Sequence, residues 1–348
     1  MQRRKAKTHR RPRQELILAP PPAPLNRPPR TDLQAEVRQL DRLAFAAIDA
    51  VAGRLAAATE QSTSLDEIRL LGTRTQILLA MKGSHRSVRH LVAGRGEQME
   101  LSLDALPITR VQLERCFVAL LIEDNPARWH TRYRKNAWKA FAEKFFRDQR
   151  ILGHFPRYAD YFGPGGRGVG LLRSFAREMD VTEDAVQTLR VQVLGGDPDP
   201  RFKTWFIADM PTPGRCGQEL SDPTHQRLAA LLYPHYDNLS HFSHGGLVGA
   251  MQAAILRNGA AANHDEQEIE RFWRGTVMEQ TLPLSYVSML FVATLFARPH
   301  LDDEPTRRGL LDAWQPYHSD GSPLGVAVWD AWAGELLGAE RPSEPEQP

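Results

Sequence analysis

Apolar residues recur at helical spacing along almost the whole chain after residue 31, and this periodicity constrains the fold more than any other feature. Strand-like alternation is weak and confined to residues 202–207, and no internal repeat is evident. The first stripe of apolar residues lies on one face of a helix with 3.6 residues per turn. The sequence therefore predicts an all-α fold, a multi-helix bundle. The residues of this first stripe are Leu33, Val37, Leu40, Ala44, Ile48, Val51 and Leu55.

Capping residues predict where the helices begin. Thr31 with Gln34, and Ser64 with Glu67, have the spacing of a capping box. Asn125 and Pro126 supply a cap and a first turn for a helix that should run to about Leu152. We expect a loop over residues 154–170. Further helix starts are expected at Pro107, Thr182, Asp222, Leu247, Asn263, Asp303 and Pro323.

The two ends of the chain differ in composition from its body. Residues 1–30 contain nine Lys and Arg, one acidic residue and seven prolines, a formal charge of +8 that leaves −6 for the remainder. Such a segment favours disorder, either as a solubilising extension or as an arm that neutralises phosphates. We expect disordered tails at 1–30 and 339–348, an N-terminal helical bundle at 31–194, an irregular Pro- and Gly-rich connection at 195–221, and C-terminal helices at 222–338 packing on the first bundle.

Cysteine content and hydropathy indicate a cytoplasmic protein. Cys116 and Cys216 are the only cysteines, which excludes a disulfide-stapled fold and a four-cysteine zinc site. The apolar run at residues 16–19 is shorter than the roughly 7–15 residues of a secretory signal core. The segment Leu282–Ala297 is shorter than the roughly 18–20 residues that span a bilayer, and Pro283 interrupts it. We therefore expect no membrane insertion.

The segment Arg128–Arg157 is the most basic part of the body, with nine Lys and Arg against two acidic residues. Four basic positions fall within roughly 60° of each other on a helix, and aromatic residues occupy the opposite half. This arrangement predicts either a nucleic-acid-binding face or an amphipathic helix whose charges are solvated or paired. Arg134 and Lys144 lie within the aromatic arc and must reach water or a carboxylate. The four basic candidates are Arg128, Arg132, Lys135 and Lys139.

Two polar groups on otherwise apolar helices are candidates for chemistry. Arg110 and Glu114 lie one turn apart on one helix. They could form part of a site in which the pKa of the carboxyl group is lowered. Alternatively, they could be a satisfied structural ion pair or a polar link between helices. Cys116 on the same helix is expected to be a small buried hydrophobe. On a later helix, spacing places Tyr236, Ser240, Ser243 and His244 on one side.

Several chemistries fit the later cluster. A metal site could use Asp237, His241 and His244, and Ser240 with His244 could form a nucleophile pair. His244 could also act as a general acid or base in phosphodiester cleavage, or the cluster could be a polar helix end capped by glycine. We assign no metal and no cofactor. The run Gly163–Gly168 matches a dinucleotide pattern without its preceding strand, so it is an anion cradle or a flexible loop.

The block Leu106–Phe146, combined with the later Tyr236-x-x-Leu239-Ser240-x-x-Ser243-His244 segment, resembles the bacterial helical proteins grouped as domain of unknown function 5677. The resemblance covers roughly residues 40–300. It implies an all-helical cytoplasmic protein with no assigned activity. It also implies that the polar residues Arg110, Glu114, Tyr236, Ser240 and His244 meet in one pocket.

A weaker similarity is to HEPN-type helical ribonucleases, which pair an Arg with a His one to two turns later. Arg257-Asn258 and His264 have about this spacing, although Gly259 interrupts the helix between them, and Arg86 with His90 is a second pair. We therefore expect a module that binds nucleic acid, a protein partner or a second copy of the chain. The alternative is a metal-independent ribonuclease in which His244, Arg110, Glu114, Tyr236 and Ser240 form the catalytic site.

Overall fold

The computed structural model describes residues 33–92, 103–195, 209–243, 279–319, 325–326, 328–330 and 332. Every regular element in these ranges is a helix and none is a strand, which confirms the predicted all-α class. The tails expected at 1–30 and 339–348 lie outside the described residues. So do the strand-like segment at 202–207, the helix starts expected at Leu247 and Asn263, and residues 196–208 of the connection expected at 195–221. The described part of that connection is not wholly irregular, because Pro213–Glu219 forms a short helix.

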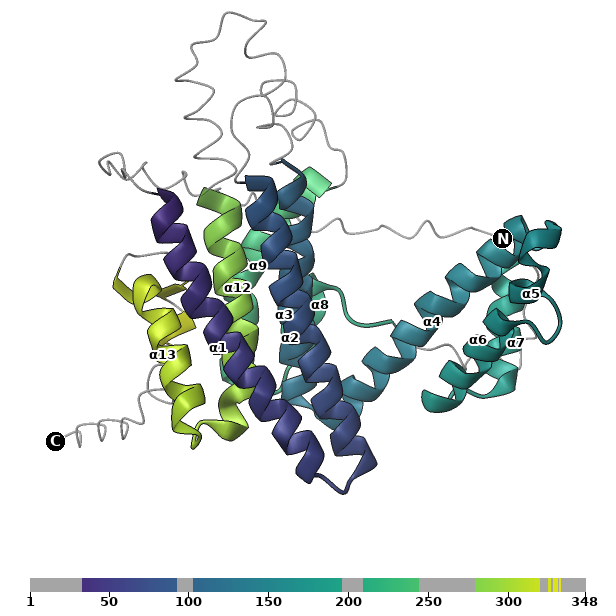
Figure 1. Ribbon diagram of the computed structural model, residues 1–348, viewed down its shortest axis with the longest axis horizontal. Coiled ribbons are helices and arrows are strands. Elements are labelled where there is room, and N and C mark those ends of the chain that lie inside the picture. Colours follow the sequence, from purple (N-terminus) through teal and green to yellow (C-terminus); the bar gives the residue numbers. More distant parts are fainter. Residues whose placement is uncertain are drawn as a thin grey trace, which may run out of the picture.

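The helices form a main bundle, from which one long helix extends to a small lobe (Figure 1). The long helix is α4, and the lobe contains α5, α6 and α7. The elements are α1 (Leu33–Gln61), α2 (Leu65–Val92), α3 (Ala105–Asp124), α4 (Pro126–Leu152), η2 (Pro156–Tyr158), α5 (Ala159–Phe162), α6 (Arg167–Glu178), α7 (Glu183–Val193), α8 (Pro213–Glu219), α9 (Pro223–Ser243), α12 (Glu279–Ala297), η5 (Arg298–His300) and α13 (Glu304–Ser319).

Asn125, Thr182 and Ser64 cap helix starts in the structure, as expected, whereas Thr31 and Pro323 lie outside the described residues. Helix α3 begins at Ala105, two residues before Pro107. The Asn125 side chain accepts a hydrogen bond from the backbone N–H of Arg128 (3.0 Å), and Thr182 Oγ1 accepts one from Ala185 (3.3 Å). Ser64 Oγ accepts the N–H of Glu67 (3.4 Å), whereas the Glu67 carboxylate accepts from Ser62 Oγ (2.6 Å). The bonds from the N–H groups of Arg128, Ala185 and Glu67 each satisfy a donor that the first turn of a helix leaves without a partner.

Helix α12 lies at the centre of the main bundle, packed against α1, α2, α3 and α13 (Figure 1). From residue 281 to residue 297 every side chain except that of Pro283 is buried. Because the neighbouring helices cover α12 on every side, it has no solvated face, and this explains why apolar residues occur all around the helix. The stretch Thr281–His300 is long and apolar enough to cross a membrane, and most of it is buried inside the protein.

A second hydrophobic cluster builds the small lobe, which we define as residues 138–193. The first turn of α4 contributes Trp129 to the main core, and the part of the helix from Trp138 onward contributes Trp138 and Phe145 to the second cluster. Leu172 of α6 and Leu189 of α7 complete this cluster with their neighbours. The main core joins α1, α2 and α3 to helices that follow residue 209, so helices on both sides of the expected connection share one interior.

The segment after α4 contains more helix than the sequence predicts. In place of the loop expected over 154–170, the structure has η2, α5 and the beginning of α6 at Arg167. Close packing of α6 against α5 requires a glycine at position 168. A Cβ atom there would lie 2.7 Å from both Cε1 and the carbonyl oxygen of Tyr161. The same close approach explains part of the glycine-rich run at 163–168 without any bound anion.

Candidate functional site

Arg110 of α3 and Tyr236 of α9 meet where these two helices pack together. Arg110 Nη2 donates a hydrogen bond of 2.9 Å to Tyr236 Oη, and the guanidinium carbon lies 5.1 Å from the centre of the Tyr236 ring. The guanidinium group therefore contacts both the hydroxyl and the ring of one tyrosine, a combination of hydrogen bonding and cation–π attraction. Two polar segments separated by 126 positions in the sequence are brought together at this contact.

Glu114 lies one turn further along α3 and faces the same guanidinium group. Its Oε1 is 3.4 Å from Arg110 Nη2, and its side chain is 40% exposed whereas that of Arg110 is 16% exposed. The carboxylate is thus accessible to solvent while the guanidinium is mostly covered. Arg110 Nε is buried and has no hydrogen-bond partner among the described residues, so one donor of the cluster is unsatisfied.

Aromatic packing fixes the position of the Tyr236 ring. Phe117 of α3 meets it edge-on with ring centres 6.0 Å apart, and Tyr233 lies 6.4 Å away on its own helix. Tyr233 in turn approaches α8, where a Cβ atom at Gly214 would lie 3.3 Å from the Tyr233 ring. The hydroxyl that accepts from Arg110 is therefore held in place by ring contacts from α3 and from its own helix, α9.

Ser240 belongs to the same helix but is engaged differently. Its Oγ donates a 2.9 Å hydrogen bond to the backbone oxygen of Tyr236, so its proton is shared with its own helix. His244 and the side chain of His241 lie outside the described residues, and Asp237 is exposed. The structure thus brings together Arg110, Glu114 and Tyr236. It leaves the metal, nucleophile and acid–base hypotheses for His244 as predictions.

Residues 209–219 contact the predicted basic face of α4. Arg128 forms an ion pair with Glu219 (2.8 Å), Lys139 pairs with Asp209 (2.7 Å), and Arg132 donates to the Asp209 carbonyl oxygen. Within the part of the chain that is described, Lys135 forms no ion pair. Two of the four positive charges on this face are therefore paired with carboxylates of the protein, and the role of the face in nucleic-acid binding stays a prediction.

The two basic residues in the aromatic arc of α4 find carboxylates, as expected. Arg134 reaches Glu178 of α6 at 3.5 Å, and Lys144 pairs with Asp148 at 2.5 Å.

Cys116 is fully buried, as expected, and burial raises its thiol pKa well above the ordinary value. The pair Arg257 and His264 lies outside the described residues, whereas Arg86 and His90 are both exposed on α2.

Sequence reasoning missed a buried polar network that joins α1, α2 and α12. His85 Nδ1 lies 2.8 Å from Ser285 Oγ, and His85 Nε2 lies 3.2 Å from Asp41 Oδ1. Tyr286 also donates to Asp41 Oδ1, and the Arg89 guanidinium contacts the other oxygen of the Asp41 carboxylate. Neither His85 nor Ser285 has exposed surface. The network therefore connects α1, α2 and α12 inside the bundle.

Electrostatics assign the protons of this network. Burial lowers the pKa of His85, so its ring is neutral at pH 7. Burial raises the pKa of Asp41, but hydrogen bonds from His85 and Tyr286 and the charge of Arg89 outweigh it, and the pKa lies below the ordinary value. An ionised carboxylate can only accept, so His85 donates from Nε2 to Asp41 and accepts at Nδ1 from Ser285.

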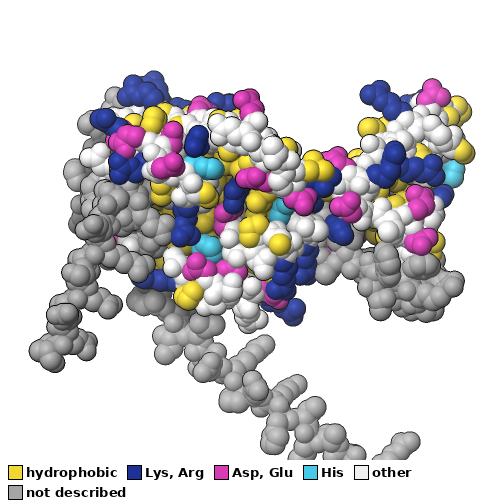
Figure 2. Space-filling model, turned by 90° about the horizontal axis from the view of Figure 1, so that it is seen from below, with side chains coloured by type: hydrophobic (Ala, Val, Ile, Leu, Met, Phe, Trp, Pro, Cys, Tyr) yellow, Lys and Arg dark blue, Asp and Glu magenta, His cyan; other side chains and the backbone are white. Residues whose placement is uncertain are grey.

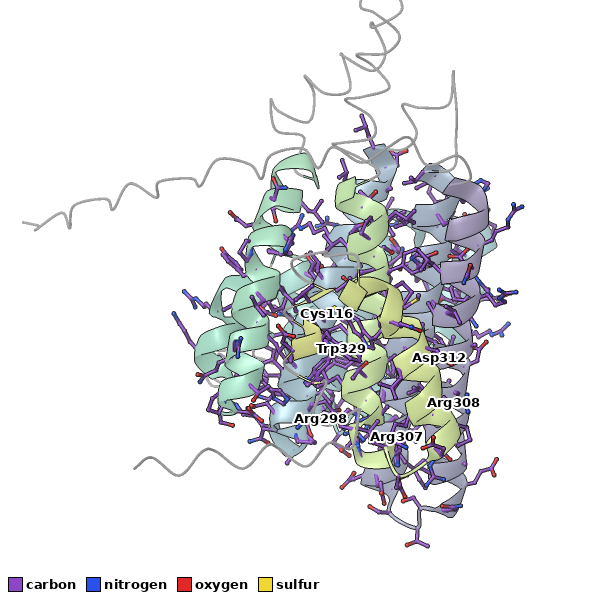
Figure 3. All side chains as sticks on the ribbon, turned by 90° about the vertical axis from the view of Figure 1, so that its left-hand side faces the viewer. Cys116, Arg298, Arg307, Arg308, Asp312 and Trp329 are labelled. Carbon is purple, nitrogen blue, oxygen red and sulfur yellow. The ribbon has the colours of Figure 1, made fainter. Side chains whose placement is uncertain are left out.

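A second polar cluster that the sequence did not reveal lies at the C-terminal end of α3, at the other end of this helix from Arg110. The Asp124 carboxylate accepts from the backbone N–H groups of Ser221 and Asp222 and from His225 Nδ1 (3.3 Å). Arg298 donates to His225 Nε2 at 3.3 Å, which leaves Nδ1 to carry the proton. Figure 3 shows Arg298 near one end of the bundle. Asp124 thus ties the end of α3 to the beginning of α9.

No family model matches the chain, and no curated protein or solved structure matches it either. The similarities to domain of unknown function 5677 and to HEPN-type ribonucleases therefore stay predictions from the residues quoted above.

Proposed function

We propose that the protein binds nucleic acid through the far end of α4, a surface that we call the α4 tip. The observation that carries this proposal is a set of arginines without acidic partners. Arg147, Arg150 and Arg157 are exposed and form no ion pair with any described residue. No acidic residue occurs between Asp148 and Asp160. The α4 tip consists of Arg147, Arg150, Ile151, His154, Phe155 and Arg157.

The α4 tip faces away from the core of the small lobe. Helical spacing places Arg147, Arg150 and Ile151 on the side of the helix opposite Phe145, which packs into the lobe, and His154 follows the end of the helix at Leu152. Ile151 is 60% exposed and Phe155 is 50% exposed. Figure 2 shows Lys and Arg side chains beside hydrophobic ones on this lobe. The surface therefore offers positive charge and apolar contact area together.

This combination fits a polyanion that also carries flat apolar groups. Guanidinium groups bind phosphates with paired hydrogen bonds, and each phosphate that they neutralise releases a counterion. The other arginines of α4 are less available because Arg128 and Arg132 contact residues 209–219. Uncompensated charge is thus greater at the tip than on the face predicted from the sequence.

Binding of a fluorescein-labelled RNA to the full chain, followed by anisotropy, tests the proposal. We expect the triple variant Arg147→Ala/Arg150→Ala/Arg157→Ala to bind at least 10-fold more weakly than the wild type. The matched control removes three exposed arginines from α6 and α7 of the same lobe, Arg173, Arg177 and Arg190. Equal losses of RNA affinity in both triple variants would show that binding depends only on the net charge of the protein, which would contradict the proposal.

The contact between α3 and α9 favours RNA cleavage as a second candidate function. Arg110 could bind a phosphate, Tyr236 fixes its guanidinium, and the exposed Glu114 carboxylate could accept a proton. Purified protein incubated with RNA and a chelator tests this function. Glu114→Gln and His244→Ala should each abolish cleavage while RNA binding persists. Uncut RNA with the wild type would reject this second function and leave nucleic-acid binding in place.

A further inference from the structure

We infer that the α4 tip takes single-stranded nucleic acid and that the Phe155 ring stacks on one of its bases. This inference rests on the proposed function and names the class of ligand. It depends on three features of the tip: an aromatic ring outside both cores, an arginine beside that ring, and a compact group of charges.

Phe155 lies outside both hydrophobic clusters although it is a large apolar residue. Its neighbours Leu152 and Tyr158 pack against the cluster of the small lobe, whereas Phe155 does not. It makes no ring contact with another aromatic residue in the described part of the chain. An exposed phenyl ring contributes nothing to the folded interior, so its free face is available to a ligand.

The backbone around Phe155 is ordered by hydrogen bonds. The Phe155 N–H donates to the Leu152 oxygen at 3.0 Å, and the Tyr158 N–H donates to the Phe155 oxygen at 2.9 Å. The Arg157 guanidinium lies 5.8 Å from the Phe155 ring centre and 4.8 Å from the Tyr158 ring centre. The ring and the positive charge are thus held next to each other before any ligand binds.

A single strand matches these features better than a duplex does. The faces of bases in a duplex are covered by their neighbours, whereas those of a single strand are free to stack on aromatic rings and guanidinium groups. Arg147 and Arg150 are separated by only about 5 Å along the helix axis. A flexible strand can bend its phosphates around such a compact group of charges, whereas a duplex cannot.

The test compares a 12-nucleotide single strand with a 12-base-pair duplex of the same sequence, each as RNA and as DNA, at fixed salt. We expect the wild type to bind the single strands at least 10-fold more tightly than the duplexes. Phe155→Ala should weaken single-strand binding on the order of 10-fold and leave duplex binding unchanged, and Phe155→Trp should restore it. Ile151→Ala is the matched control, since it removes an exposed apolar side chain without an aromatic face.

The outcomes separate this inference from the proposed function. Equal binding of single strand and duplex, or no effect of Phe155→Ala, overturns the inference. The proposed function survives that result if the triple arginine variant still binds more weakly. If the arginine variant binds like the wild type, both fail. Binding to anionic lipid vesicles that depends on Phe155, without binding to any oligonucleotide, also overturns both and identifies a lipid surface as the ligand.

Discussion

Arg110 and Tyr236 connect α3 to α9 by a 2.9 Å hydrogen bond between a mostly covered guanidinium group and a packed phenol. The bond brings into contact two polar segments that lie far apart in the sequence, one on α3 and one on α9. It also makes the position of Arg110 depend on α9, because Glu114 lies further from the guanidinium (3.4 Å) and is more exposed.

Tyr236→Phe removes the acceptor of this bond and keeps the ring. We expect the free energy of unfolding to fall by about 1 kcal/mol, the usual contribution of one partly buried hydrogen bond. Urea unfolding measures this difference. Tyr233→Phe is the control, because Tyr233 is 39% exposed and its hydroxyl is not bonded to Arg110. Equal effects of the two substitutions would contradict the role given to Tyr236.

Ser285→Ala should destabilise the main bundle more than Ser288→Ala does. Both serines are fully buried on α12, but Ser285 lies 2.8 Å from His85 Nδ1, whereas Ser288 Oγ has no hydrogen-bond partner within the described residues. Loss of the Ser285 hydroxyl leaves a buried acceptor unsatisfied, at a cost of about 1–3 kcal/mol. Thermal and urea unfolding of both variants check the difference. A larger loss from Ser288→Ala would refute the hydrogen-bonding scheme.

The stability that His85 gives should depend on pH in a defined direction. The pKa of His85 is lowered in the folded protein, so below about pH 6.5 the unfolded chain binds a proton that the folded chain does not. Stability is therefore lost as the pH falls from 6.5 toward the folded pKa, by at most about 1.4 kcal/mol per pH unit. Asp41 contributes little here, since its pKa is lowered from an unfolded value of 3.8 and its stabilisation is lost only as the pH falls below about 5.

Unfolding of the wild type and His85→Gln between pH 7.5 and pH 5 measures this effect. The wild type should be the more stable protein at pH 7.5, and the difference should narrow as the pH falls. Other histidines titrate in both proteins and cancel in the comparison. A difference that stays constant or widens toward pH 5 would show that His85 is not held neutral.

Replacing either of two glycines of α6 with alanine should change stability in opposite directions. Gly168→Ala places a Cβ atom 2.7 Å from Tyr161, whereas a Cβ atom at Gly170 has no neighbour within 4 Å. We expect Gly168→Ala to cost about 1–3 kcal/mol through overpacking. Gly170→Ala should stabilise the helix by up to about 1 kcal/mol. Amide hydrogen exchange across α5 and α6 measures the local effect, and similar protection in both variants would contradict this packing.

The helices could be predicted because their signals are local. Asn125, Thr182 and Asp303 each cap a helix start with a bond to the residue three positions later, which sequence patterns capture well. The central position of α12 was not predicted, although its apolar composition on every side is typical of a helix covered by others. The lobe packed on the second half of α4 was not anticipated either.

Long-range polar partners could be predicted only in part. The proximity of Arg110 and Tyr236 came from the quoted family resemblance, since spacing alone cannot join positions 126 residues apart. Asp41 and His85 do carry a signal, because each falls within an apolar stripe and a buried polar residue needs a partner. The partners of Arg128 and Lys139 lie on residues 209–219, and no local pattern of α4 predicts them.

The salt dependence of single-stranded RNA binding tests the central claim most directly. Three arginines that neutralise phosphates contribute about 2 to the slope of log K against log salt concentration. We predict that the slope of the triple variant of Arg147, Arg150 and Arg157 is shallower by about that amount than the slopes of the wild type and of the Arg173, Arg177 and Arg190 control. Equal slopes for all three proteins would contradict the account.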